Sequence, residues 1–176
     1  IERGDVESAA WPDWQRVKDR REPPKKTIWI SLAIVHYVIA WMRKRPERSI
    51  VWYDRAGFGE KVAELGGFPL CQGGDDAKLA QLAGAPCVAS IRAHGQIKNL
   101  QAWDRALVAG APASGKTTEQ LLARHHRDGQ PSDEVWFSFL VHTREFRDAI
   151  RESIRRAHYQ EDTTLQQQRI LYSTKV

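Results

Sequence analysis

The chain has 176 residues, of which 41% are hydrophobic and 28% charged, so it is long enough and apolar enough for one globular domain with a real core. Lysine and arginine exceed aspartate and glutamate by 27 to 22, and the formal charge of +5 suits a polyanionic partner without requiring one. The spacing of Cys71 and Cys87 excludes a cysteine-based metal or redox motif and indicates reduced thiols in a cytoplasmic protein. No signal peptide is visible, and the combination of Ile1 with a single methionine, Met42, indicates a fragment or processed product.

The first part of the chain combines prolines with many charges. Pro12, Pro23 and Pro24 fall within residues 1–26, which we expect to form a linker or irregular arm with a short helix near residues 14–20.

An apolar run follows at residues 28–42, with basic residues on both sides, and predicts a helix over residues 27–45. A membrane-spanning helix is the alternative. The run is shorter than the ~20 residues that cross a bilayer, and His36 lies in its middle, so a helix buried in a protein core is favoured. The basic residues 43–45 are expected to be a solvated helix end.

Short apolar runs then alternate with helical segments as far as the C-terminus. Strands are predicted at residues 49–53, 69–71, 87–91, 105–109 and 134–141. Helices are predicted at residues 57–65, 75–83, from Thr117 onward, at 143–159, and as a final helix or tail over 163–174. This alternation indicates an α/β fold with a parallel sheet covered on both faces.

The most informative segment, residues 120–130, carries two arginines three positions apart. On a helix, Gln120, Arg124 and Arg127 fall on one face at i, i+4 and i+7. Two guanidinium groups held on one face can neutralise the charge that builds on a γ-phosphate during phosphoryl transfer. A basic surface helix with solvated arginines is the alternative.

A second segment, residues 90–101, follows the strand predicted at residues 87–91. In doubly wound parallel sheets, ligands gather at the carboxyl ends of the strands. The segment contains hydroxyl, imidazole and cationic side chains that suit contact with a nucleic-acid backbone, namely Ser90, Arg92, His94 and Lys98. An ordinary turn between a strand and a helix is the alternative.

Both segments resemble motifs of one family. Residues 120–130 resemble motif VI of superfamily 2 helicases, especially the Swi/Snf-type branch, which usually reads Gln-x-x-Gly-Arg-x-x-Arg-x-Gly-Gln; Ala123 replaces its glycine. Residues 90–101 resemble motif V, whose core is a glycine followed by Asn-Leu, in the version encoded by phages and prophages. The resemblance covers about residues 27–160 and implies a helicase C-terminal RecA-like domain there, with residues 161–176 as a C-terminal helix or tail.

The resemblance implies a RecA-like three-layer α/β sandwich that is the second lobe of an ATP-dependent helicase or translocase. In such enzymes ATP binds between two lobes, and Arg124 and Arg127 would reach its γ-phosphate while Gln120 helps to position them. ATP and Mg²⁺ would be held mainly by an N-terminal lobe on the same or another polypeptide. This chain alone would then hydrolyse ATP weakly or not at all.

Motif V would connect that ATP site with a nucleic acid, with DNA favoured and RNA as the alternative, in the cytoplasm of a bacterial or phage-infected cell and without a membrane partner. The residues that the resemblance places toward the nucleotide are Gly95, Asn99 and Gln101. Those that it places toward the nucleic acid are Ser90, Arg92, His94 and Lys98.

A rival motif lies at residues 110–117, which match the P-loop pattern G-x-x-x-x-G-K-[ST] between a predicted strand and a predicted helix. Its backbone amides would cradle phosphates with Lys116 at the β- and γ-oxygens, which would make the chain an NTPase or kinase by itself. Most of the predicted sheet precedes the motif, and Asp133 and Glu134 lie before the apolar run at residues 135–140, whereas a Mg²⁺-binding acid should follow its strand. The helix that would follow this P-loop also carries Arg124 and Arg127, which already belong to the other motif. A non-catalytic nucleic-acid-binding module is a third possibility.

Histidine and tryptophan side chains complete the candidates. His125 and His126 are adjacent on a helix and point about 100° apart, so they do not form a metal pair and are expected to face solvent or an interface. Aromatic side chains can stack on single-stranded bases. For Trp103 the sequence does not decide between that role and a position in the core. Tryptophans in apolar elements are predicted to be core residues, namely Trp29, Trp41, Trp52 and Trp136.

Overall fold

The computed structural model describes residues 11–17, 27–44, 46–73, 82, 84–94, 100–110 and 115–172. It divides into two compact units, Ile1–Ile30 and Ser31–Val176. In the first unit, helix α1 spans Trp11–Val17, three residues earlier than the short helix that the sequence predicts. The remaining helices and strands belong to the second unit, whose start falls a few residues after the predicted domain boundary at residue 27.

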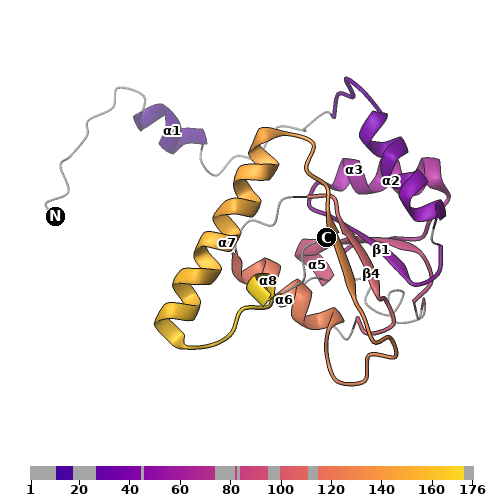
Figure 1. Ribbon diagram of the computed structural model, residues 1–176. Coiled ribbons are helices and arrows are strands. Elements are labelled where there is room, and N and C mark those ends of the chain that lie inside the picture. Colours follow the sequence, from indigo (N-terminus) through magenta and orange to yellow (C-terminus); the bar gives the residue numbers. More distant parts are fainter. Residues whose placement is uncertain are drawn as a thin grey trace, which may run out of the picture. The chain divides into compact units, whose positions relative to one another are not determined.

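In the described part of the chain, five parallel strands form one sheet in the order β2-β3-β1-β4-β5 (Figure 1). The strands are β1 (Ser49–Tyr53), β2 (Leu70–Cys71), β3 (Cys87–Ser90), β4 (Arg105–Val108) and β5 (Trp136–Phe139). All five residues of the central strand β1 are buried, as expected where both faces of a parallel sheet are covered. The fold class predicted from the sequence, a RecA-like three-layer α/β sandwich, is therefore confirmed.

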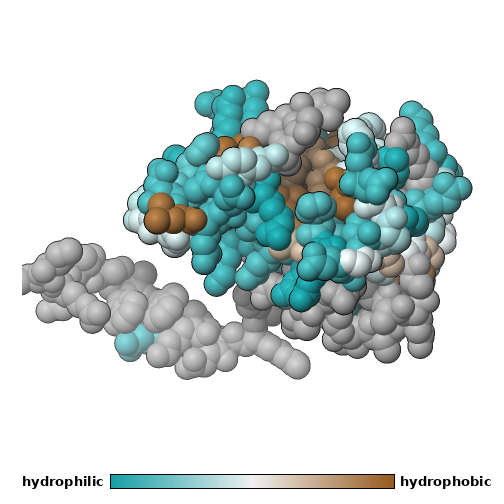
Figure 2. Space-filling model, turned by 60° about the horizontal axis from the view of Figure 1, so that its bottom comes forward, coloured by the Kyte–Doolittle hydropathy of each residue, from teal (hydrophilic) through white to brown (hydrophobic). Residues whose placement is uncertain are grey.

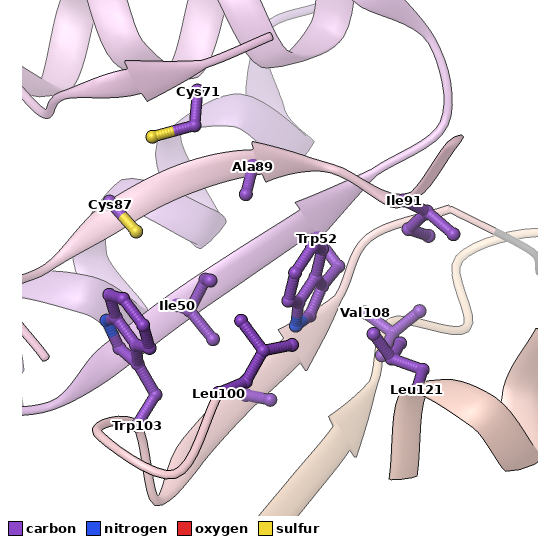
Figure 3. Close-up of a cluster of buried hydrophobic side chains, with 11 residues drawn as sticks. Ile50, Trp52, Cys71, Cys87, Ala89, Ile91, Leu100, Trp103, Val108 and Leu121 are labelled. Atoms are coloured by element: carbon purple, nitrogen blue, oxygen red, sulfur yellow. The ribbon is translucent and has the colours of Figure 1, made fainter. Parts of the chain in front are cut away.

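The two faces of the sheet carry separate hydrophobic clusters, because successive side chains of a strand point to opposite sides. Ile50 and Trp52 of β1 face one cluster, which also receives Leu121 of helix α6 (Gly115–His125), as Figure 3 shows. Val51 and Tyr53 face the other cluster, which is covered by helices α2 (Ala33–Lys44) and α3 (Ala56–Gly66). Each fully buried large apolar side chain contributes about 1.5–3 kcal/mol to the stability of the fold.

Two further helices cover the outer side of α6. Helices α7 (Arg144–Thr164) and α8 (Arg169–Tyr172) meet α6 around Leu122, Ala157 and Ile170 (Figure 1). Gly115 permits the close approach of α6 to α7, because a Cβ there would lie 3.0 Å from the carbonyl oxygen of Ser153. This glycine of residues 110–117 therefore has a packing role whether or not a phosphate binds nearby.

The apolar run at residues 28–42 is only partly helical. Helix α2 begins at Ala33, and Ile30 is fully exposed, so the prediction of a helix from residue 27 is wrong at its start. The prediction of a core position is also wrong for Trp29, which is 36% exposed. No helix among the described residues is long and apolar enough to cross a membrane.

In the view of Figure 2 the described surface is mainly hydrophilic, with apolar atoms gathered in a hollow near the centre.

The remaining predicted elements lie close to their expected places. Of the other tryptophans predicted to be core residues, Trp52 is fully buried and Trp41 is half-buried. The prediction is wrong for Trp136, which is 44% exposed, because its strand β5 is an edge strand that pairs with β4 alone in the described sheet. Helix α7 runs on to Thr164, across the predicted boundary at residue 160. The helix predicted at residues 75–83 lies outside the described residues except for Leu82.

Candidate functional site

The carboxyl ends of β1, β2 and β3 surround an open hollow of about 450 Å³, which holds two of the residues predicted to contact nucleic acid, Ser90 and Arg92. Arg92 lies on the short helix α5 (Ile91–His94) and its side chain is 73% exposed. It forms a two-point ion pair with Asp54, with 2.7 Å from Nε to Oδ1 and 3.4 Å from Nη2 to Oδ2. The carboxylate of Asp54 raises the pKa of the Arg92 guanidinium, which therefore stays charged.

Asp54 also touches the start of residues 110–117. Strands β1 and β4 are neighbours, and the helices that follow them, α3 and α6, cover opposite faces of the sheet. The carboxyl ends of β1 and β4 therefore form a topological switch point, where parallel α/β sheets bind ligands. A Cβ on Gly110 would lie 2.9 Å from the backbone N of Asp54, so the two chains meet closely there. The sequence signal for Asp54 is its position directly after the most apolar strand. Sequence reasoning considers acids only near the strand after the P-loop pattern and therefore overlooks it.

The other predicted residues of this segment lie elsewhere. His94 is fully buried, and its Nε2 lies 2.6 Å from the carbonyl oxygen of Gln72, so the imidazole is not available for contact with nucleic acid in this structure. His94 is the last residue of α5 and lies in the interior, a placement that the local sequence does not reveal. Gly95, Lys98 and Asn99 lie outside the described residues.

The predicted catalytic residues follow α6 toward the opposite, amino edge of the sheet. Gln120 and Arg124 lie within the helix and are half-buried, but α6 ends at His125 and leaves Arg127 in the turn beyond it. The prediction that all three share one helical face is therefore wrong for Arg127. This exposed arginine instead borders a second hollow of about 490 Å³, lined by His126, Arg127, Asp128, Gly129, Gln130, Ser132 and Arg169.

Arg48, which precedes β1, organises the turn that follows α6. Its Nη1 donates to Oγ of Ser132 at 2.7 Å, and its Nη2 donates to Oε1 of Gln130 at 3.1 Å. Gln130 in turn donates through Nε2 to the carbonyl oxygen of His125 at 2.9 Å. Asp104 lies 3.1 Å from Nη1 of Arg48 and balances its charge. These contacts connect the turn to the residue before β1, and sequence reasoning gives Arg48 no role.

The end of residues 90–101 is bonded to the last turn of α6 and to the turn that follows it. The backbone N–H of Leu100 donates to the carbonyl oxygen of Arg124 at 3.2 Å. The side-chain amide of Gln101, predicted to lie toward the nucleotide, donates to the carbonyl oxygen of Asp128, the residue after Arg127. The segment thus begins at the carboxyl edge with Ser90 and ends at the amino edge beside the arginines. Ser90 and Arg92 are not brought next to Arg124 and Arg127.

His125 anchors the end of α6 in the core. Its ring is fully buried, which contradicts the prediction that it faces solvent or an interface. The indole Nε1 of Trp52 donates to its Nε2 at 3.3 Å, so Nδ1 carries the proton and donates to the carbonyl oxygen of Trp103 at 2.9 Å. Burial lowers the pKa of His125 to about 4, although the bond to Trp103 opposes the shift, and the imidazole is neutral at pH 7.

Trp103, the tryptophan that the sequence leaves open, is a core residue. It is buried, and its Nε1 donates to the carbonyl oxygen of Ala85 at 2.9 Å. It therefore presents no ring face to a nucleic-acid base.

For the rival motif, α6 begins at Gly115, two residues before the predicted start, and Lys116 is exposed at its first turn. Residues 111–114 lie outside the described residues. Within the described ranges, no group of three histidine, cysteine, aspartate or glutamate side chains is placed to hold a metal ion.

Comparison of the chain with protein-family models and with curated proteins finds no match.

Proposed function

We propose that this chain is the C-terminal RecA-like lobe of an ATP-dependent nucleic-acid helicase or translocase of the superfamily 2, Swi/Snf-like type. The observation that carries the proposal is the junction between its two motif segments. Leu100, near the end of residues 90–101, is hydrogen-bonded to Arg124 in the last turn of α6, and Gln101 is hydrogen-bonded to Asp128 in the turn that bears Arg127. A segment that contacts nucleic acid at one end would thereby adjoin the arginines at the other.

The arginines would act on ATP bound between this lobe and an N-terminal lobe on the same or another polypeptide. That lobe would hold most of the ATP and Mg²⁺, and Arg127, with Arg124, would stabilise the charge that develops on the γ-phosphate. Such an arginine contributes about 10³–10⁵-fold to phosphoryl-transfer rates. The bonds from Arg48 to the turn support this role, because a finger must be positioned before the reaction occurs.

The nucleic acid would lie along the carboxyl edge of the sheet. Ser90 and Arg92 border one open hollow there, and hydroxyl and guanidinium groups are common contacts of the phosphate backbone. Closure of the two lobes around ATP would then shift the nucleic-acid contacts through residues 90–101. Repeated closure and opening would move the protein along its track.

The test is Arg127→Ala in a protein that carries both lobes. We expect ATP turnover to fall by about 10³-fold or more while binding of an ATP analogue is largely retained, because the arginine acts on charge that appears in the transition state. Arg144→Ala is the matched control, since Arg144 is 82% exposed on α7 and pairs with Asp148. Wild-type turnover in Arg127→Ala would remove this residue from the finger role.

One observation favours a second candidate, a self-contained P-loop NTPase. Asp54 lies at the carboxyl end of the strand beside β4, next to Gly110, where a P-loop protein needs a Mg²⁺-binding acid. Titration of the purified chain with a fluorescent ATP analogue and Mg²⁺ separates the two functions. Weak or absent binding supports a lobe that needs its partner. Micromolar binding that is lost in Lys116→Ala would establish a working P-loop and end the helicase proposal.

A further inference from the structure

The ion pair at the carboxyl edge joins Asp54, which the sheet holds in place, to Arg92, whose exposed side chain can move. Asp54 follows the buried strand β1 directly, its side chain is 24% exposed, and Gly110 packs against its backbone. The Arg92 side chain is 73% exposed and extends from the short helix α5. The guanidinium can therefore leave the carboxylate by rotating its own side chain, with no change in the sheet.

The partner that the guanidinium would take is a phosphate group. Its planar fork binds carboxylate and phosphate oxygens with the same two-point geometry, so a phosphate can replace Asp54 directly. Exposed ion pairs of this kind are weak, which makes the exchange easy. Arg55 lies beside the same carboxylate, with Nε 3.8 Å from Oδ2, and its side chain is 87% exposed. Ser90 adds a hydroxyl group to the hollow.

We propose that Asp54 masks Arg92 and competes with the phosphates of a nucleic-acid backbone for its guanidinium. Asp54 thus weakens each contact enough for it to exchange along a track, and it sets the affinity and salt dependence of binding at this edge. The inference rests on the proposed function, because it takes a polynucleotide as the ligand.

The test is a fluorescence-anisotropy titration of a labelled DNA duplex with the purified chain over a range of salt concentrations. Asp54→Asn should raise the affinity at low salt by about two- to fivefold, the range for releasing one exposed ion pair. It should also steepen the plot of log affinity against log salt by up to about 0.9, the value of one additional phosphate contact. Arg92→Gln should lower both the affinity and the slope.

The double variant Asp54→Asn/Arg92→Gln separates masking from simple repulsion. If Asp54 acts by holding Arg92, the gain disappears when Arg92 is absent, and the double variant binds like Arg92→Gln. Asp148→Asn removes the same charge from an exposed acid on α7 that pairs with Arg144 and Arg151. It should leave the affinity unchanged. Thermal unfolding checks that every variant is folded.

Four results would overturn the inference. A gain that persists in the Arg92→Gln background, or an equal gain in Asp148→Asn, would show a general charge effect. A wild-type chain that binds the duplex without any gain from Asp54→Asn would refute masking and leave the proposed function intact. Failure of every variant to bind the duplex, while Asp54→Asn tightens binding of free ATP, would assign Arg92 to a mononucleotide and count against the nucleic-acid part of the proposed function as well.

Discussion

At the scale of single residues, His125 connects the arginine-bearing turn to the centre of the sheet. Its ring lies edge-on to the rings of Trp52 and Phe137, with distances of 5.8 Å and 5.0 Å between ring centroids. Both of its nitrogens have hydrogen-bond partners. A buried imidazole with this environment resists protonation, because the charged form would lose its hydration and its bond from Trp52. Protonation of His125 would therefore destabilise the end of α6, next to Arg124 and Arg127.

This environment predicts a loss of stability in mild acid. The pKa of His125 is about 4 in the folded protein and 6.5 when unperturbed. Above pH 6.5 both states hold the imidazole neutral. As the pH falls from 6.5 toward 4, the unfolded state binds a proton that the folded state rejects, and the free energy of unfolding falls by up to about 1.4 kcal/mol per pH unit.

Urea unfolding of the wild type and of His125→Phe, at pH 7 and pH 5, checks this prediction. The variant should be less stable at pH 7 by about 1–3 kcal/mol, because Trp52 and Trp103 lose a buried partner. Its stability should then decline less than that of the wild type between the two pH values. An equal decline in both proteins would mean that another group controls the acid sensitivity.

At the scale of elements, Glu119 fastens α8 to α6. Its side chain is 16% exposed; Oε1 lies 3.2 Å from Nη1 of Arg169, and Oε2 accepts from the backbone N–H of Ile170 at 3.3 Å. A carboxylate at the first turn of a helix satisfies an amide that would otherwise lack a partner within the helix. Since Arg169 and Arg127 border the same hollow, the contact also shapes the surroundings of the candidate finger.

Replacing this carboxylate by an amide should loosen α8. Glu119→Gln is expected to destabilise the protein by about 0.5–1.5 kcal/mol and to speed hydrogen exchange at the amide of Ile170. Glu152→Gln is the control, since Glu152 pairs with Arg155 and Arg156 on the solvent side of α7. Unchanged protection of Ile170 in Glu119→Gln would show that apolar packing alone holds the helix.

At the scale of the whole molecule, the described core belongs to the second unit. The buried hydrophobic residues that the structure describes run from Val35 to Ile170. The second unit should therefore fold without the first. Its final helix is part of the core through Ile170, although it is only four residues long.

Two truncations test this division. Removal of residues 1–30 should change the free energy of unfolding by less than about 0.5 kcal/mol, because the described buried hydrophobic residues lie between Val35 and Ile170. Removal of residues 165–176 should lower it by about 2–3 kcal/mol, since Ile170 no longer covers Leu122 and Ala157. Urea unfolding measures both, and a large loss from the first truncation would contradict the assignment of units.

The local pattern of the sequence determined much of the fold by itself. Runs such as residues 49–53 combine β-branched and aromatic residues, and glycine or proline interrupts the chain between elements, so strands and helices are set by neighbouring residues. Because the strands are joined by helical segments, the parallel sheet follows as well, and with it the expectation that Ser90 and Arg92 lie at a carboxyl edge.

Strand order and burial were decided only by the tertiary structure. The neighbourhood of β1 and β4 places Asp54 against Gly110, and the two strands are more than 50 residues apart in the chain. The partners of His125 include Trp52, 73 positions away, so a polar residue at the end of a basic helix became part of the core. Trp136 became exposed because its strand took the edge of the sheet. Such outcomes depend on which distant surfaces pack together, and the free energy of that packing is not contained in any local pattern.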